Sequence, residues 1–376
     1  MDILTIKDLN TPSRILLGPG PSMVSPRVLR AMTTPLLGHL DPQYLKIMDE
    51  VQHLLRFVFQ TKNELTLSIS GTGSAGMETA LCNFIEPGDR VLVAIMGFFG
   101  MRLFDMAGRY GARVDKIERP WGQVFDPDEI DTALRGKNYK LLALVHAETS
   151  TGAWQPGIAD IAAAAHQHGA LFVLDTVTSL GGLPVEIDAW DVDIAYSAAQ
   201  KCLSASPGVA PLTISPRAVD VLHHRHTPVA NWYLDLTGLV KYWGTEHAYH
   251  HTAPISLNYA LREALRLVAE EGLENCFTRH RANAEILWNG LEALGLPLLM
   301  AKQNRLPSLS TPKIPSSVDD TSVRQRLLNE YNIEIAGGFG PLKGQVWRIG
   351  LMGFSSRREN VILLLAALRE ILSTPG

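Results

Sequence analysis

Between residues 65 and 215 the chain alternates short apolar runs with longer segments whose apolar positions recur at helical spacing. Short apolar runs bounded by polar or glycine residues are typical of strands buried on both faces. Strands that alternate with helices predict a mainly parallel sheet in a doubly wound α/β domain. The predicted strands are 65–69, 91–95, 113–117, 141–145 and 170–175, and the helices between them include 98–110 and 158–168.

Proline positions refine this pattern. A proline directly after an aspartate cap predicts a helix over 41–59 and a further helix start at 126–129. The apolar run 209–214 follows the preceding strand too closely for a helical crossover, so we expect it to be antiparallel. Pro211 lies inside this run and is unfavourable there, because proline donates no ladder hydrogen bond.

The carboxyl-terminal third has a different pattern. Residues 228–254 are aromatic and polar, which predicts a long irregular connection. Two helices are expected at 255–271 and 273–294, separated near Gly272, and the remainder resembles a small α+β domain with a helix from about residue 357. We therefore expect an amino-terminal segment, a large domain and a small domain. Their limits are 1–19, 20–272 and 273–376.

Composition narrows the class of protein. The 376 residues are enough for about two domains, and 46% hydrophobic with 19% charged residues is ordinary for a globular chain. A net charge of −4 gives no basic footprint for nucleic acid, and no apolar run is long enough to span a membrane. No secretion signal precedes the first elements, and the three cysteines are far apart, so we expect reduced thiols in the cytoplasm. The histidine spacings suggest no metal site.

One lysine interrupts an apolar run. The segment from 193 reaches Lys201 and breaks at residues 206–208, Ser-Pro-Gly. The lysine stem could pack while its ammonium reaches water, as most lysines do. Alternatively, burial lowers its pKa, and the neutral amine can then form a Schiff base with an aldehyde.

A carboxylate ends another apolar run. Residues 170–175 end at Asp175, which on its own is most simply a turn or cap residue. In open α/β sheets, however, ligands bind beyond the carboxyl ends of the strands, where Asp175 and Lys201 would face one crevice. Pyridoxal phosphate requires this pair, an amine for its aldehyde and a carboxylate for its pyridinium nitrogen.

A glycine-rich turn provides a candidate phosphate site. The sequence S-G-T-G-S-A-G-M-E at 70–78 lies between a predicted strand and a predicted helix. Free N–H groups at a helix amino terminus bind anions, and the candidates here are Thr72, Gly73 and Ser74. The spacing fits neither a P-loop nor the dinucleotide motif G-x-G-x-x-G.

Together these motifs resemble the class V aminotransferases of fold type I, most of all the alanine–glyoxylate and serine–pyruvate aminotransferases. The resemblance rests on S-A-A-Q-K at Lys201, L-D-T-V-T-S-L-G-G at Asp175, S-G-T-G-S, Y-H-H-T and R-I-G-L-M-G, and it spans almost the whole chain. It implies a homodimer with pyridoxal 5'-phosphate in a large domain with a mixed, mainly parallel sheet between helices, and a small carboxyl-terminal α+β domain.

The resemblance also assigns roles to residues. Lys201 would hold the cofactor as an aldimine and carry the proton, and Asp175 would pair with the ring nitrogen. Arg348 would bind the substrate carboxylate, and Gly20 would border the pocket. The remaining implied cofactor contacts are Thr72, Gly73, Ser74 and Gln200 at the phosphate, Val177 and Phe99 at the ring, Thr149 at the phenolic oxygen, and Tyr249 and Thr252 from the other subunit.

Two positions depart from the family pattern. Some relatives have histidine where this chain has Ser74, and tryptophan where it has Phe99, although phenylalanine can also stack on a ring. Taken singly, some residues have simpler interpretations. Arg348 could form a surface ion pair, Phe99 could belong to the core, and Tyr249 and Thr252 could be polar loop residues.

The resemblance implies a transaminase that moves the amino group of alanine or serine to glyoxylate or pyruvate by a ping-pong mechanism. One alternative on the same fold is a cysteine desulfurase, which needs an exposed, nucleophilic cysteine on a mobile loop. Another alternative is a non-catalytic nucleotide-binding protein that uses the glycine-rich turn, but it leaves Lys201 and Asp175 unexplained.

Overall fold

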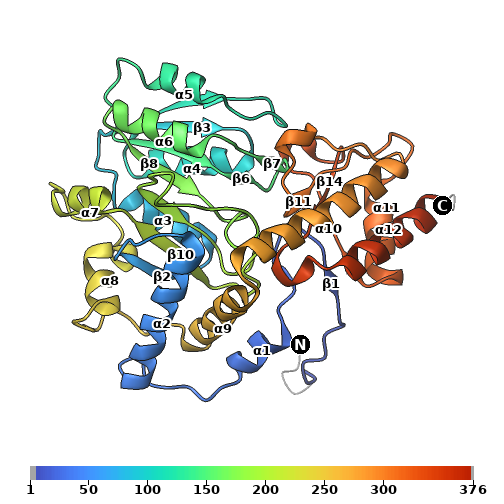
Figure 1. The fold of residues 1–376 in the computed structure, drawn as a ribbon, viewed down its shortest axis with the longest axis horizontal. Coiled ribbons are helices and arrows are strands. Elements are labelled where there is room, and N and C mark those ends of the chain that lie inside the picture. Colours follow the sequence, from blue (N-terminus) through green and yellow to red (C-terminus); the bar gives the residue numbers. More distant parts are fainter. Residues whose placement is uncertain (1–5, 374–376) are drawn as a thin grey trace.

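The computed structural model describes residues 6–373 and is built around a seven-stranded sheet (Figure 1). The strand order is β2-β10-β9-β8-β5-β3-β4. These strands are β2 (Thr66–Ser70), β3 (Arg90–Ile95), β4 (Arg113–Glu118), β5 (Leu141–Val145), β8 (Leu171–Asp175), β9 (Ile194–Tyr196) and β10 (Val209–Ile214).

Five neighbouring strands of the sheet are parallel and β10 is antiparallel to both of its neighbours, which confirms the predicted directions. Pro211 lies in β10 opposite Ser68. Its carbonyl accepts a hydrogen bond from Ser197 N (2.8 Å), just beyond the end of β9. The missing proline N–H therefore falls where the β9 ladder has ended, which explains why a proline is tolerated in an interior strand.

The helices agree closely with the predicted ones. Their amino termini often carry the predicted caps: Asp41 accepts from Gln43 N before α2, and Asp126 forms a capping box with Glu129 before α5. The helices are α1 (Pro26–Met32), α2 (Pro42–Phe59), α3 (Gly73–Cys82), α4 (Phe98–Arg109), α5 (Pro127–Leu134), α6 (Ile158–Gln167), α7 (Pro216–His223), α8 (Leu236–Trp243), α9 (Ile255–Glu271), α10 (Leu273–Ala293), α11 (Asp320–Glu330) and α12 (Arg358–Ser373).

The prediction of a wholly irregular connection over 228–254 was wrong. It contains a 3-10 turn (Trp232–Leu234) and the helix α8. Asp235 caps α8 by accepting from Thr237 N at 2.8 Å, and the helix buries one apolar face. The signal was an aspartate followed by apolar residues at helical spacing, but the surrounding aromatic and polar residues concealed it.

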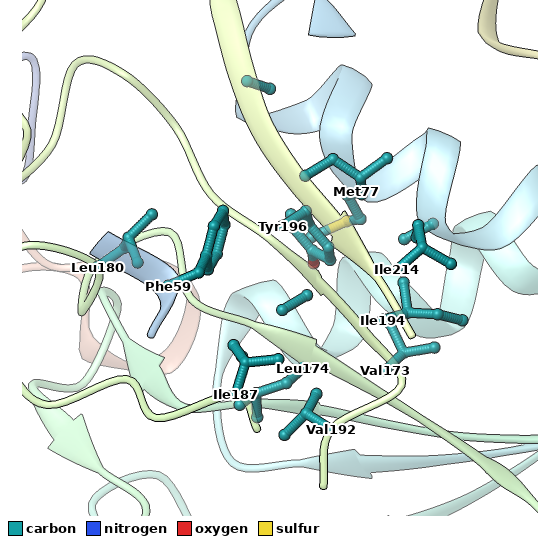
Figure 2. Packing of buried hydrophobic residues seen from close by; sticks show 14 of the residues in the cluster. Phe59, Met77, Val173, Leu174, Leu180, Ile187, Val192, Ile194, Tyr196 and Ile214 are labelled. Atoms are coloured by element: carbon teal, nitrogen blue, oxygen red, sulfur yellow. The ribbon is translucent and has the colours of Figure 1, made fainter. Parts of the chain in front are cut away.

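The buried hydrophobic residues form a large cluster around the sheet and a second one toward the carboxyl terminus. Figure 2 shows part of the large cluster, from Phe59 of α2 to Ile214 of β10, with Tyr196 of β9 among these residues. Tyr196 is fully buried although it ends in a hydroxyl, so this hydroxyl needs a hydrogen-bond partner.

The second cluster combines both ends of the chain. It consists of residues from α10 to α12 together with Leu17, and β1 (Ile15–Leu16) pairs in parallel with β12 (Ile333–Glu334). In Figure 1 the blue amino-terminal segment accordingly runs beside the orange and red carboxyl-terminal elements. A three-stranded sheet, β11-β14-β13, completes this part, with β11 (Leu309–Ser310), β13 (Ala336–Gly337) and β14 (Trp347–Gly350). The proposed domain limits stay a prediction.

Two short strands, β6 (Ala147–Glu148) and β7 (Ala153–Trp154), pair beyond the end of β5. Within residues 6–373, no helix is both long and apolar enough to cross a membrane.

Candidate active site

The parallel pairing of β8 and β9 brings the two principal candidates together. Asp175 is the last residue of β8 and pairs in register with Tyr196, the last residue of β9. Lys201 follows five positions later in the chain, after a turn. Because the strands are parallel, both side chains lie at the same edge of the sheet, as the sequence predicted.

Asp175 is a buried carboxylate held from two sides. Val177 N donates to its Oδ1 at 2.8 Å and the Tyr196 hydroxyl donates to its Oδ2 at 2.7 Å. Burial raises its pKa to about 6, despite these hydrogen bonds. A carboxylate in this state is stabilised by a cation, and each oxygen retains a lone pair for one, so the residue suits a pyridinium N–H.

Lys201 is partly buried, and its Nζ donates to the Pro19 carbonyl. Its pKa is lowered to about 8, chiefly by burial; the nearby Arg348 and Arg102 cations also lower it, while Cys202 and Asp175 raise it. A β-carbon on Gly20 would lie 2.7 Å from Nζ, so only glycine permits this close approach of the amino-terminal turn. A minority of the amine, far more than for an ordinary lysine, is therefore neutral at physiological pH, as the reactive interpretation of Lys201 requires.

The glycine-rich turn lies at the amino terminus of α3. Thr72 is the N-cap residue, and its hydroxyl makes no capping hydrogen bond. The first turn of a helix leaves its N–H groups without intrahelical acceptors, here those of Gly73 and Ser74. A β-carbon on Gly73 would lie 2.9 Å from Ala198 Cβ, so a glycine is needed where the turn packs on the segment before Lys201.

The residues of this turn fit a phosphate group. Gln200, the residue before Lys201, adds a further polar group. Its Oε1 is buried and has no hydrogen-bond partner. A rotated amide would present its NH₂ donors to an anion instead. An orphaned amide and a free helix amino terminus are the donors that a cofactor phosphate would satisfy.

Arg102 is a cation that the sequence analysis missed. It lies on α4, donates from Nη1 to Ser74 Oγ at 3.1 Å, and makes no ion pair with a carboxylate of the described residues. Its guanidinium lies 4.9 Å from the ring centre of Phe99. It therefore places positive charge beside the phosphate cradle, and only the packing of α4 against α3 could reveal this.

Phe99 and Val177 are both partly buried, as residues that pack on a cofactor ring should be. Phe99 meets the ring of Phe98 edge to face, with ring centres 5.7 Å apart. Val177 follows Asp175, and its Cγ2 would lie 3.5 Å from a β-carbon on Gly73. Val177 thus lies between the carboxylate and the phosphate cradle.

Thr149 is buried, and its hydroxyl shares a hydrogen bond of 2.6 Å with Thr178. The preceding Glu148 is also fully buried and was missed by the sequence analysis. Its Oε2 accepts from the N–H of Phe99 (3.1 Å) and of Gly100 (3.3 Å). Although burial raises its pKa, this carboxyl caps α4 and fixes the position of Phe99.

Arg348 lies in β14 and is buried, which excludes a surface ion pair. Its Nε donates to the Gly337 carbonyl at 2.8 Å, and its guanidinium lies over the ring of Phe339 at 3.8 Å. Burial lowers its pKa to about 10. Within the described part of the chain, Nη1 and Nη2 have no hydrogen-bond partner, so they are available to a carboxylate.

Within this chain, Tyr249 and Thr252 do not contact the other candidate site residues. Tyr249 is 60% exposed, with its ring 5.1 Å from that of His39, and Thr252 is exposed. Between them, His251 shares a hydrogen bond of 2.6 Å with Ser70, at the end of β2 just before the glycine-rich turn. The segment therefore passes near the phosphate cradle while these two side chains face outward.

The cysteines do not suit a nucleophilic role. Cys82, Cys202 and Cys276 are all free, and each is at most 2% exposed. Burial raises the pKa of each thiol to about 12, whereas a cysteine desulfurase needs an exposed thiolate. No group of three or more metal-binding side chains occurs in residues 6–373.

Comparisons with known proteins agree with this geometry. The chain is 43% identical to the (S)-ureidoglycine–glyoxylate transaminase of Bacillus subtilis (strain 168), over 97% of this chain and 92% of the relative. It is 41% identical to the alanine–glyoxylate aminotransferase of Mus musculus, over 97% and 89%. A crystal structure of alanine–glyoxylate aminotransferase from Nostoc sp. superposes with a TM-score of 0.96 at 56% identity, covering 98% of this chain and 97% of that one.

A solved cysteine desulfurase from Thermococcus onnurineus NA1 is only 15% identical, which shows the shared fold alone. The predicted fold class is therefore confirmed, and the desulfurase alternative is not supported. The family model described as "Aminotransferase class-V" matches residues 15–351, and the chain belongs to this family.

Proposed function

We propose that this class V aminotransferase uses pyridoxal 5'-phosphate to move the amino group of a small amino acid, alanine or serine, to glyoxylate or pyruvate by a ping-pong mechanism. The observation that carries the proposal is the joint placement of Lys201, Asp175 and Arg348: an amine with a lowered pKa, a buried carboxylate and a buried guanidinium with a free edge. A nucleotide-binding role would use none of the three.

The described residues would hold the cofactor in three places. Thr72, Gly73, Ser74 and Gln200 would bind its phosphate, Asp175 its ring nitrogen, and Phe99 with Val177 the two faces of its ring. When bound, the cofactor supplies an electron sink that makes the α-carbon proton of an amino acid acidic.

Lys201 performs the proton transfer in this proposal. Its lowered pKa lets the neutral amine accept the α-proton at physiological pH and return it as a general acid. With a pyridinium opposite it, Asp175 would remain ionised, because the cation would offset the burial that raises its pKa. Arg348 orients the substrate carboxylate through two parallel hydrogen bonds, which sets the α-carbon in line with Lys201.

Glyoxylate is the acceptor that the relatives' names share, whereas their donors differ between alanine and (S)-ureidoglycine. The donor is therefore the open part of the proposal. The purified protein loaded with pyridoxal phosphate should be assayed with alanine, serine, glycine and (S)-ureidoglycine against glyoxylate and pyruvate. The highest kcat/KM with alanine or serine supports the proposal. A kcat/KM more than about tenfold higher with (S)-ureidoglycine would show that this compound, and not alanine or serine, is the donor.

We also propose a homodimer in the cytoplasm, with active sites shared between subunits. The dimer is supported by the exposure of Tyr249 and Thr252. Their segment lies close to the phosphate cradle, because His251 between them is hydrogen-bonded to Ser70. A ligand bound only by the dimer stabilises the dimer.

Mixed dimers test this sharing. A Lys201→Ala subunit is combined with a Tyr249→Phe/Thr252→Ala subunit. In the hybrid, the site with the intact lysine receives Tyr249 and Thr252 from the other chain, so it should retain cofactor normally. The double-mutant homodimer should not. Equal cofactor retention by hybrid and double mutant would exclude a shared phosphate site.

A further inference from the structure

The guanidinium of Arg348 is covered on one face by a single aromatic ring. Phe339 lies 3.8 Å from the Arg348 Cζ, measured to the ring centre, and it comes from the loop that joins β13 to β14. The Gly337 carbonyl accepts the Nε hydrogen bond at 2.8 Å. These two contacts fix the plane of the guanidinium and leave the edge formed by Nη1 and Nη2 free.

Burial alone does not explain Phe339. Its side chain is 38% exposed, so the ring is not an ordinary core residue. A stacked cation and ring attract each other, and the attraction is stronger where the cation is partly desolvated, as Arg348 is. The contact of the ring with the arginine is therefore favourable although the ring itself is only partly buried.

The loop that carries Phe339 is fixed by the glycines around it. A β-carbon on Gly338 would lie 2.1 Å from the Leu342 carbonyl oxygen, so no other residue fits there. Gly340 has φ +47°, and a β-carbon on it would lie 3.2 Å from the Trp121 ring. Backbone packing on both sides of Phe339 thus limits the positions that its ring can take.

A second ring, from the amino terminus of α4, contacts Phe339. The ring centres of Phe98 and Phe339 are 5.1 Å apart. Phe98 is the first residue of α4, and its N–H donates to Ser150 Oγ at 2.9 Å beside the buried Glu148. Phe339 therefore connects the amino terminus of α4 with Arg348, which otherwise belongs to the carboxyl-terminal sheet.

We propose that Phe339 is a positioning residue for Arg348: it holds the guanidinium edge-on to the site so that both Nη groups meet the substrate carboxylate. The inference rests on the proposed function, since it names the residue that prepares the substrate site. Without the ring, the guanidinium would be free to tilt about the single Nε hydrogen bond. One of the two parallel hydrogen bonds to the carboxylate would then be lost.

The test compares Phe339→Ala, Phe339→Leu and Phe339→Tyr with the unchanged protein, all loaded with pyridoxal phosphate. Phe57→Ala is the matched control, because Phe57 is 42% exposed on α2 and has no place in the site. The KM for alanine and for glyoxylate should rise about tenfold in the Ala and Leu variants, with kcat within about twofold, as loss of a stacked cation–ring contact predicts. The Tyr variant should retain the normal KM.

An amine without a carboxylate separates positioning from general damage. The single-turnover rate with ethylamine should be the same in all variants, because ethylamine offers nothing to Arg348. A KM for alanine that is unchanged in Phe339→Ala would overturn the proposal. So would an equal loss with ethylamine and alanine, since that pattern indicates a structural role.

A measurement that needs no turnover separates this inference from the proposed function. The Arg348 Nε–H resonance, assigned by its loss in Arg348→Lys, is titrated with propionate in the holoprotein. Phe339→Ala should weaken propionate binding about tenfold, and unchanged binding contradicts the inference. If the unchanged protein binds propionate but transaminates none of the donors, the proposed function fails while the role of Phe339 stands.

Discussion

The two halves of the candidate site are built differently. The groups that react, Lys201 and Asp175, lie at the ends of neighbouring parallel strands. Asp175 accepts hydrogen bonds from Val177 and Tyr196, and Lys201 donates to the Pro19 carbonyl. The group that recognises substrate, Arg348, comes from the small carboxyl-terminal sheet and is held by one carbonyl and one half-exposed ring. The reacting groups are therefore positioned by a rigid sheet edge, whereas the recognition of the substrate carboxylate depends on a loop.

This difference has a physical consequence. A side chain fixed by a sheet edge tolerates little change, because its neighbours cannot move independently. A side chain fixed by a loop can be adjusted without disturbing the reacting groups, since loops tolerate substitution better. We therefore expect changes on the sheet side to affect the reaction itself and changes on the Arg348 side to affect mainly KM.

The largest effect is expected for Lys201→Ala. The variant loses the cofactor tether and the proton carrier, so kcat should fall at least about 1,000-fold. Its circular dichroism spectrum should remain that of the unchanged protein, because the lysine stem is only partly buried. Transamination of alanine and glyoxylate at more than a few per cent of the normal rate would remove Lys201 from its role.

Asp175→Asn is expected to lower kcat and cofactor affinity by about 100-fold each, because an amide cannot balance a pyridinium charge. Equilibrium dialysis with pyridoxal phosphate measures the affinity. The isosteric amide retains the hydrogen bond from Val177, so folding should change little. Near-normal kinetics would place the ring nitrogen elsewhere.

The pKa of about 8 for Lys201 predicts how cofactor capture by the cofactor-free protein depends on pH. Only the neutral amine attacks an aldehyde, and its fraction rises as the pH rises through the pKa. Between pH 6 and pH 8 the capture rate of pyridoxal, followed by absorbance, should therefore increase about 50-fold and then level off above pH 9. A rate that still rises nearly tenfold between pH 8 and pH 9 would indicate an ordinary lysine.

Arg348→Lys is expected to raise the KM for amino and keto acid substrates about 20-fold while kcat changes little. A lysine keeps the charge but cannot form two parallel hydrogen bonds. Steady-state kinetics with both substrates measure the effect. An equal fall in kcat would show that Arg348 also affects the reacting groups. That result would contradict the expected separation between the reaction and substrate recognition.

The smallest effect is expected for Arg102→Gln. Removing this cation beside Ser74 should weaken pyridoxal phosphate binding about fivefold, while pyridoxal, which lacks the phosphate, should bind unchanged. Fluorescence titration of the cofactor-free protein with each compound makes the comparison. An equal loss for both compounds would assign Arg102 to the ring-stacking region around Phe99 instead.

Much of the reacting half could be predicted from the sequence, because its signals are local. The apolar run that ends at Asp175 and the one that leads to Lys201 fix both strands, and parallel strands bring their ends together. The glycine-rich turn at Thr72–Ser74 and the helix after it are equally local. The prediction of an irregular segment over 228–254 was wrong, because the short capped helix α8 lies among polar and aromatic residues that hide its helical pattern.

The remaining parts were decided by tertiary structure. Arg102 faces the phosphate cradle only because α4 packs beside α3, and Phe339 covers Arg348 only because β13 and β14 pair around their loop. Tyr196 bonds Asp175 across two strands that are 21 residues apart in sequence. The sequence by itself determined the strands of the main sheet, most of the long helices and the residues that end them. Contacts between side chains on separate elements depend on packing, which no local pattern encodes, and these contacts set the charges and hydrogen bonds of the site.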